Sequence, residues 1–314
     1  MRIPKYLSPS SLAKWHFNQE EFYLQYLADE RPPRFPQTQP MSVGSSFDAY
    51  VKAYYNEALS INNPEYEFES LFESQVEEHN RDWARDAGKI AFEQYKHSGA
   101  AADLLSDLLK SEGTPRFEFT LQKEVGGVPI LGKPDAWYTV ASTNVILDWK
   151  VNGYCGRTPT SPKKGYVRCR DGWSPATSKT HNQMHKACTP MRVGGILVNI
   201  NEYFETINKD WAIQLGTYAW LMGAEVGESF VCALDQLACA PGPRIRVAEH
   251  RGMIGPEFQH NLLKQYQELW EIVNSDHIFR DLSYEESAER CLVLDNQYLA
   301  YQDNDDIMRE ITGR

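Results

Sequence analysis

The chain has 314 residues, of which 42% are hydrophobic and 24% charged, and its formal net charge is −11. This composition is ordinary for a globular protein with a sizeable core. No run of 18 apolar residues occurs, which excludes a transmembrane helix, and the N-terminus has no apolar secretory signal. Six cysteines without tight pairing favour reduced thiols. We therefore expect a cytoplasmic protein that does not bind membranes.

The charge is unevenly distributed along the chain. The segment from Val151 to Arg192 contains a single acid, Asp171, and eight basic residues, so it carries +7 and the remainder −18. The basic residues are Arg157, Lys163, Lys164, Arg168, Arg170, Lys179, Lys186 and Arg192. A net negative charge argues at first sight against a polyanionic partner, but such a segment can attract a phosphate backbone locally. The alternative is a solvated, flexible loop.

Helical patterns fill the first 113 residues. Ser8-Pro9-Ser10-Ser11 provides hydroxyl caps before LAKWHFNQEEFYLQYL, which predicts a helix. Four prolines between 32 and 40 then predict an extended connector. A second helix is expected from near Ser42 to Leu59. Two more are expected within residues 64–112.

Strand patterns begin at Arg116. RFEFTLQKEV, a turn at Gly126-Gly127 and VPILGKPDAWYTV lead to VILDWKV, with a turn expected at Ser142–Asn144. After the basic segment we expect a strand at ILVNI, a long helix over 201–225, strands within 229–239 and 243–253, and a helix over 256–274. This order predicts one α/β domain over residues 1–314. Its parts are a mainly helical region (1–113), a β-meander (114–151), a basic insertion (152–195), and a core helix with strands and a C-terminal helix (196–314).

Three charged residues, Asp135, Asp148 and Lys150, lie in otherwise apolar strands. Side chains 148 and 150 share a face because side chains alternate along a strand, and hairpin pairing brings Asp135 near Asp148. Two adjacent carboxylates repel unless one is protonated or a cation binds them, and Mg²⁺ or Mn²⁺ prefers such oxygens. A metal with a lysine that positions water suits hydrolysis of a phosphodiester. The alternative is a solvent-facing salt bridge worth under about 1 kcal/mol.

Pro134-Asp135 followed by Asp148-x-Lys150 resembles the motif of the PD-(D/E)XK nuclease superfamily, and specifically its RecB-like and Cas4-like branch. SPSSLAKWHFNQEEFYLQYL resembles the opening helix of that branch, and Gln214-x-x-x-Tyr218 matches a motif on its later helix. Gly44-Ser-Ser-Phe-Asp48 lies where the branch usually has Gly-x-x-x-His. The likeness covers residues 8–50, 117–151 and 200–222, in the same order.

The resemblance implies a central mixed β-sheet flanked by helices and a metal-dependent deoxyribonuclease. An exonuclease in recombination, repair or phage DNA processing is the favoured form, in a bacterial or phage-infected cell. It also implies DNA as partner, together with a single-strand-annealing or other recombination protein. The implied ligands of Mg²⁺ or Mn²⁺ are Asp48, Asp135, Asp148 and the Trp149 carbonyl, with Lys150 orienting the nucleophilic water. Gln214 and Tyr218 would line the DNA groove; the alternative is that both are structural.

The sequence departs from this branch in its cysteines and in its basic segment. The opening helix has no cysteine, and Cys232, Cys239 and Cys291 form no tight trio, so an iron–sulfur cluster is not expected. The basic segment is interpreted as a DNA-contacting loop in which Lys163, Lys164, Arg168 and Arg170 bind phosphates. Zinc is the alternative for residues 155–188, with ligands from Cys155, Cys169, His181, His185 and Cys188.

Three other functions stay open from the sequence. The same core could form a structure-specific or restriction-type endonuclease. It could also form a DNA-binding subunit that does not cut, although such a protein has no need of buried like charges. The motifs could, finally, be coincidental in an α/β metabolic enzyme.

Overall fold

The computed structural model describes residues 2–31, 36–155, 167–171, 183–184, 190–239 and 245–275, with side chains left out at 169–171 and 183–184. The chain divides into two compact units. The first unit comprises Met1–Pro36, Gln122–Leu131 and Asn261–Arg314, and the second comprises Gln37–Leu121 and Gly132–His260. Each unit is described by itself. The single nuclease domain expected over residues 1–314 stays a prediction.

The first unit combines short helices with a hairpin. It contains α1 (Pro9–Phe17), α2 (Gln19–Phe22), a π-helical turn (Tyr23–Leu27), strands β2 (Leu121–Val125) and β3 (Val128–Gly132), and most of α9 (Pro256–Asn274). Ser8 and Ser11 form a capping box at the start of α1, where the sequence predicts hydroxyl caps. The predicted hairpin turn is also confirmed, because Gly126 and Gly127 both have positive φ, the conformation that a two-residue turn requires.

Two predicted long helices are each interrupted at an asparagine. Asn18 separates α1 from α2, and Asn208 separates α7 (Phe204–Ile207) from α8 (Lys209–Leu221). Each asparagine has an extended backbone, and its side-chain oxygen accepts a hydrogen bond from a backbone N–H of the following helix. An asparagine side chain competes with the helical backbone in this way, so it caps the next helix and ends the previous one.

The helices of the second unit begin earlier and are more numerous than expected. They are α3 (Gln39–Ala58), α4 (Phe68–Gln75), α5 (Arg81–Ser98), α6 (Ala100–Leu108), α7 and α8, with 3₁₀ turns at Pro64–Tyr66 and Glu78–Asn80. Thr38 caps α3, and Pro40 lies in its first turn, where a missing N–H costs nothing, so the helix begins earlier than the start predicted near Ser42. Gly99, with φ of 90°, separates α5 from α6, so residues 64–112 form three helices.

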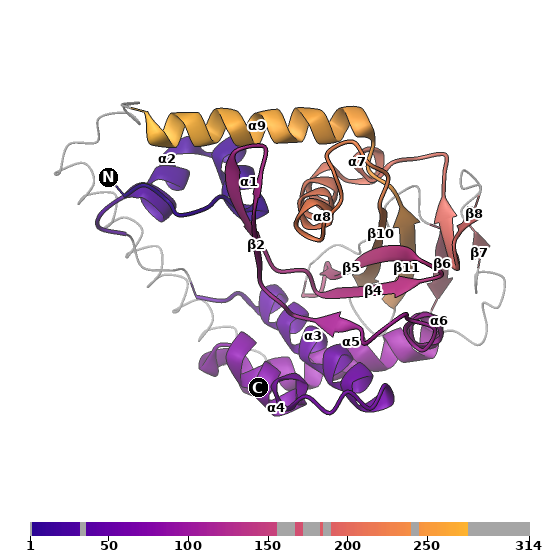
Figure 1. Ribbon diagram of the computed structural model, residues 1–314. Coiled ribbons are helices and arrows are strands. Elements are labelled where there is room, and N and C mark those ends of the chain that lie inside the picture. Colours follow the sequence, from indigo (N-terminus) through magenta and orange to yellow (C-terminus); the bar gives the residue numbers. More distant parts are fainter. Residues whose placement is uncertain are drawn as a thin grey trace. The chain divides into compact units, whose positions relative to one another are not determined.

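The main sheet of the second unit is mixed, as predicted. Among the described residues it has seven strands in the order β1-β4-β5-β10-β11-β6-β7, and β5 runs parallel to β10 while the other pairs are antiparallel. The strands are β1 (Arg116–Phe117), β4 (Ala136–Val140), β5 (Thr143–Asn152), β6 (Arg168–Asp171), β7 (Gln183–Met184), β10 (Val231–Cys239) and β11 (Ile245–Gly252). An α/β fold with a central mixed sheet flanked by helices is therefore confirmed (Figure 1).

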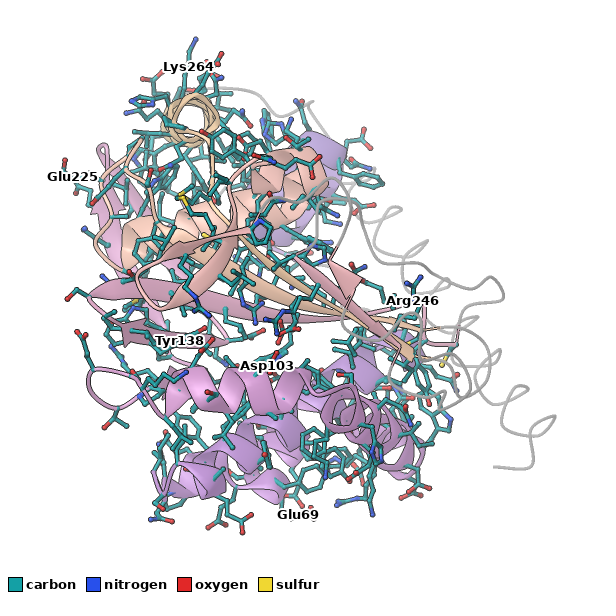
Figure 2. The ribbon with its side chains drawn as sticks, turned by 90° about the vertical axis from the view of Figure 1, so that its right-hand side faces the viewer. Glu69, Asp103, Tyr138, Glu225, Arg246 and Lys264 are labelled. Atoms are coloured by element: carbon teal, nitrogen blue, oxygen red, sulfur yellow. The ribbon has the colours of Figure 1, made fainter. Side chains whose placement is uncertain are left out.

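The two faces of this sheet bury different side chains. Leu147, Trp149 and Val247 belong to a core shared with α3, α5 and α6, and these helices form one layer against the sheet (Figure 2). Because side chains alternate along β5, Asp148 and Lys150 point to the opposite face, where α8 packs. The charged residues of β5 thus lie between the sheet and α8.

The β4–β5 hairpin forms as predicted, but its turn is one residue earlier. Val140 pairs with Thr143, so the turn consists of Ala141 and Ser142, whose φ values are 47° and 59°. These left-handed values match the twist of the strands but are unusual for residues other than glycine and asparagine. The turn expected at Ser142–Asn144 is corrected accordingly.

Two other expectations need correction. Hairpin β2–β3 forms a sheet of its own and does not continue the main meander. The basic segment was expected to be a loop, yet its described parts contain three strands. Strand β6 pairs with β11 on one side and with β7 on the other. Strand β8 (Pro190–Val193) pairs with β9 (Ile196–Asn199). Strand formation satisfies the backbone hydrogen bonds of this polar stretch. No helix within the described ranges is long and apolar enough to cross a membrane.

Candidate metal centre

The β4–β5 hairpin brings Asp135, Asp148 and Lys150 together. Ala136 pairs with Leu147, so Asp135 lies next to Asp148 across the two strands. The Trp149 backbone N–H donates to Asp135 Oδ2 at 3.1 Å, and Lys150 Nζ lies 2.7 Å from Asp148 Oδ2. The spatial convergence expected from the alternation of side chains is present, while the catalytic roles of the three residues stay predictions.

A second group of charges meets Asp135 from the helical layer. Lys52, one turn after Asp48 on α3, is fully buried and contacts Asp48 Oδ2 at 2.5 Å, Asp135 Oδ1 at 3.4 Å and Glu118 Oε2. Lys133 Nζ contacts the other oxygen of Glu118. Asp135 therefore links the two groups of charges, because its Oδ1 contacts Lys52 and its Oδ2 accepts from the backbone N–H between Asp148 and Lys150.

Burial, mutual repulsion and the nearby lysines shift the pKa values of Asp48, Asp135 and Asp148 in different directions. Burial raises the pKa of Asp148 to about 7; Lys150 opposes this shift and the Asp135 charge adds to it. Burial also raises the pKa of Asp48 to about 7, against the effect of Lys52. The pKa of Asp135 is lowered, because Lys52, Lys150 and the Trp149 N–H together outweigh its burial. The site thus holds more carboxylate charge than its lysines compensate.

Oxygen atoms of Asp48, Glu118 and Asp135 suit a hard divalent cation. One carboxylate oxygen from each lies within 4.8 Å of the other two, so a single ion can contact all three. Among the described residues, the buried Asp148 Oδ2 forms an ion pair with Lys150 but no well-aligned hydrogen bond. Ligand sets made of carboxylates favour Mg²⁺, Mn²⁺ or Ca²⁺ over softer metals.

The predicted ligand set and this geometry overlap but differ. Asp48 and Asp135 belong to both; Glu118 was missed, and the roles of Asp148 and the Trp149 carbonyl as ligands stay predictions. Glu118 has a φ of 49°, a strained conformation for this residue, and its backbone N–H donates to Asp135 O at 3.1 Å. Such strain is common at functional sites. A sequence signal existed, since Glu118 is an acid between Phe117 and Phe119, both buried.

Gln214 and Tyr218 lie on α8 above Asp148. Gln214 Nε2 donates to Asp148 Oδ1 and to Tyr218 Oη, both at 3.0 Å, and Tyr218 is buried. The amide therefore orients the carboxylate of Asp148, and Tyr218 holds the amide. Contact of either residue with DNA stays a prediction.

The predicted phosphate-binding residues lie apart from this centre or outside the described part of the chain. Arg168 pairs with Asp103 at 2.5 Å, so its charge already has a partner. Lys163 and Lys164, and the side chain of Arg170, lie outside the described residues. So do the side chains of Cys169, His181, His185 and Cys188, which leaves the zinc alternative untested; Cys155 is described and exposed.

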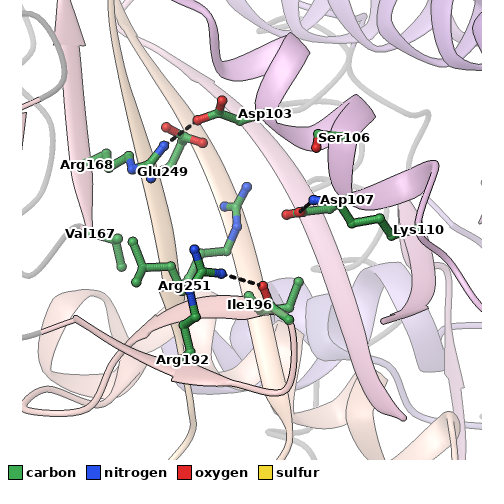
Figure 3. Close-up of a pocket in the computed structure, with 12 residues that line it drawn as sticks. Asp103, Ser106, Asp107, Lys110, Val167, Arg168, Arg192, Ile196, Glu249 and Arg251 are labelled. Atoms are coloured by element: carbon green, nitrogen blue, oxygen red, sulfur yellow. Dashed lines mark hydrogen bonds and ion pairs between the residues drawn. The ribbon is translucent and has the colours of Figure 1, made fainter. Parts of the chain in front are cut away.

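A polar pocket in the second unit is lined by charges of both signs. Figure 3 shows Arg168, Arg192, Arg251 and Lys110 facing Asp103, Asp107 and Glu249. Four cations and three acids nearly cancel, and Arg192 donates to the Gly195 carbonyl at 3.1 Å. The carboxylates of the candidate metal centre are not among the residues that line this pocket. Its balanced charges do not favour a ligand of either sign.

Comparisons with known proteins give remote similarities only. No protein-family model matches the sequence, and no curated protein matches it. Among solved structures, the chain is similar to a "putative exonuclease" from Eubacterium rectale, at 14% identity and a TM-score of 0.39, over 87% of this chain and 83% of that one. It is also similar to SSO0001, at 13% identity and a TM-score of 0.24, over 83% of this chain and 85% of that one. A functional proposal therefore depends on the geometry of the site.

Proposed function

We propose that this protein is a metal-dependent nuclease that hydrolyses phosphodiester bonds in DNA, built on a RecB-like PD-(D/E)XK core. The observation that carries the proposal is the meeting of Asp135, Asp148 and Lys150 beside a second pair of carboxylates, Asp48 and Glu118. A structural salt bridge needs one carboxylate per ammonium. An excess of carboxylates, of which Asp48 and Asp148 have raised pKa values, is instead typical of a site that binds a cation or transfers protons.

Each described residue of the centre has a role in this proposal. Asp48, Glu118, Asp135 and Asp148, with the Trp149 carbonyl, would hold Mg²⁺ or Mn²⁺. The ion supplies positive charge for the phosphate and the leaving oxygen, and it favours ionisation of water. Lys150 would orient the attacking water, since its ammonium is held beside Asp148. Gln214 would keep Asp148 in its binding orientation.

The substrate is proposed to be linear DNA, degraded from an end as in recombination, repair or phage DNA processing. Lys163, Lys164 and Arg170 would contact phosphates from the basic segment, with Arg168 tied to Asp103 and so contributing less. Tyr218 is buried, which favours support of Gln214 over base stacking. A single-strand-annealing protein would be the natural partner of such an exonuclease.

A cleavage assay with linear and circular DNA tests this function. The wild-type protein should degrade the linear form in Mg²⁺ or Mn²⁺, and EDTA should stop the reaction. Cutting of closed circular DNA as well would make it an endonuclease. Binding without cutting in either metal would contradict the enzymatic proposal and favour a DNA-binding subunit.

A further inference from the structure

Lys52 has an unusual position for a lysine. It lies on α3 with a side chain that is 0% exposed, whereas lysines are almost never fully buried unless they are paired. Its ammonium contacts three carboxylates, from Asp48 on its own helix, from Glu118 after β1 and from Asp135 before β4. The ammonium thus lies among the same three carboxylates that could bind a divalent cation.

An ammonium and a metal ion cannot use this space together. The three oxygens that contact Lys52 Nζ are Asp48 Oδ2, Glu118 Oε2 and Asp135 Oδ1. The remaining oxygens of Glu118 and Asp135 are engaged by Lys133 and by the Trp149 N–H. A divalent cation that binds all three carboxylates therefore needs oxygens that Lys52 now holds, and the two cations repel each other at such short range.

We propose that Lys52 is an internal counter-cation: it holds Asp48, Glu118 and Asp135 together in the metal-free protein, and a divalent cation must displace its ammonium to bind all three. This inference deepens the proposed function, on whose metal site it rests. Lys52 is a positioning residue that lowers metal affinity and keeps the metal-free site assembled. Without it, the carboxylates of Asp48, Glu118 and Asp135 would repel one another more strongly, because the one ammonium that contacts all three would be missing.

Lys133 provides a matched control. It contacts the same carboxylate, Glu118, but its side chain is 49% exposed. Removing either lysine subtracts one positive charge from the cluster. Only Lys52 blocks the space between the three oxygens, and the charge of Lys133 is largely screened by water. The two substitutions therefore separate displacement from a general change in charge.

The experiment measures Mn²⁺ binding by electron paramagnetic resonance, without DNA, for wild type, Lys52→Met and Lys133→Met. Lys52→Met should melt at a lower temperature than wild type without metal, bind Mn²⁺ about tenfold more tightly or better, and gain more thermal stability from Mn²⁺. Lys133→Met should change the affinity much less. Equal or weaker Mn²⁺ binding by Lys52→Met would overturn the inference, because it would make Lys52 an organiser of the ligands.

A second comparison covers the case in which Lys52→Met does not fold. The double variant Lys52→Met/Glu118→Gln removes one charge of each sign and should fold; it should bind Mn²⁺ more tightly than Glu118→Gln alone. Equal affinities in that pair would overturn the inference. If wild type binds Mn²⁺ and cuts DNA while these variants match their controls, only the inference fails. If wild type and all variants bind no Mn²⁺ and DNA stays intact, the proposed function fails with it.

Discussion

Two groups of charges in the second unit differ in their balance. Arg251 and Asp235 form a buried pair in which Arg251 Nη1 lies 2.6 Å from Asp235 Oδ1, and Tyr95 Oη donates to the other oxygen at 2.5 Å. The candidate metal centre instead has four carboxylates, Asp48, Glu118, Asp135 and Asp148, against three lysines, Lys52, Lys133 and Lys150. In the first group one guanidinium balances one carboxylate, whereas the second group has one carboxylate more than it has lysines.

Structural and functional charges respond differently to substitution. In a satisfied pair, removal of either partner leaves a buried charge alone and destabilises the fold. In a cluster with an unmatched carboxylate, removal of a carboxylate whose pKa is raised relieves repulsion while it destroys the site. Stability and function then change in opposite directions, as is common where a site is built at the expense of stability. The following substitutions test this contrast.

The largest effect is expected from the two carboxylates of the hairpin. Asp148→Asn and Asp135→Asn should each abolish detectable DNA cleavage, because the cation loses charge and geometry together. Their stabilities should diverge at pH 8. Asp148→Asn should unfold at the same urea concentration as wild type or at a higher one. The raised pKa of the Asp148 carboxyl means that the folded protein disfavours its ionised form. Asp135→Asn should be less stable than wild type, because the lowered pKa of the Asp135 carboxyl means that the folded protein favours its ionised form.

Urea titration and a cleavage assay on the same preparations check this prediction. Gln214→Ala serves as the control for the change in stability, since it removes a hydrogen bond from Asp148 but no charge. Cleavage by Asp148→Asn at the wild-type rate would show that the cluster is structural.

Lys150→Ala is expected to lower turnover by about 10² to 10⁴, the range for a positioned acid–base group. Its ammonium lies 2.7 Å from Asp148 Oδ2, so it can act on a water beside that carboxylate. Single-turnover cleavage at saturating DNA measures the effect, and Mn²⁺ titration should show that metal binding persists. Loss of Mn²⁺ binding in this variant would assign Lys150 the role of holding Asp148.

Arg251→Met tests the balanced group. It should destabilise the protein by about 3 to 5 kcal/mol, because Asp235, with 0% side-chain exposure, loses its charge partner. The double variant Arg251→Met/Asp235→Asn should recover much of this loss, since the amide oxygen can still accept from Tyr95 Oη. The free energy of unfolding from urea titration gives both values. A double variant no more stable than the single one would contradict the view that an unpaired charge causes the loss.

His250, beside this pair, predicts a pH dependence of stability. Burial, together with the nearby Arg251 charge, lowers the pKa of His250 to about 3. In the unfolded chain this histidine has a pKa near 6.5 and binds a proton, whereas in the folded protein it stays neutral. The free energy of unfolding therefore falls as the pH drops below about 6.5. Between pH 7 and pH 5, His250 lowers the free energy of unfolding by about 2 kcal/mol. The Asp148 carboxyl, whose pKa is raised, acts in the opposite direction over this range.

Comparison with His250→Gln isolates the contribution of the histidine, because Asp148 is present in both proteins. The difference in unfolding free energy between wild type and His250→Gln should shift by about 2 kcal/mol from pH 7 to pH 5. A difference that does not change with pH would mean that the imidazole can be protonated in the folded state.

Much of this architecture followed from local patterns in the sequence. Alternation of apolar residues located β4 and β5, and side-chain alternation alone placed Asp148 and Lys150 on one face. Helix α9 has the predicted bounds, Pro256–Asn274. Breaks at Asn18 and Asn208 were missed because an asparagine that caps a helix has no apolar period to reveal it.

The composition of the candidate metal centre was decided by tertiary structure. From the sequence, Asp135, Asp148 and Lys150 were predicted to converge, because they lie on one hairpin and side chains alternate along its strands, although the turn was placed one residue too late. Glu118 and Lys52 were not predicted from the sequence. Lys52 reads locally as a surface partner of Asp48, four residues before it on α3, and only packing of that helix against the sheet buries it between Glu118 and Asp135. Such contacts join residues 66 and 83 positions apart, and no local periodicity encodes them.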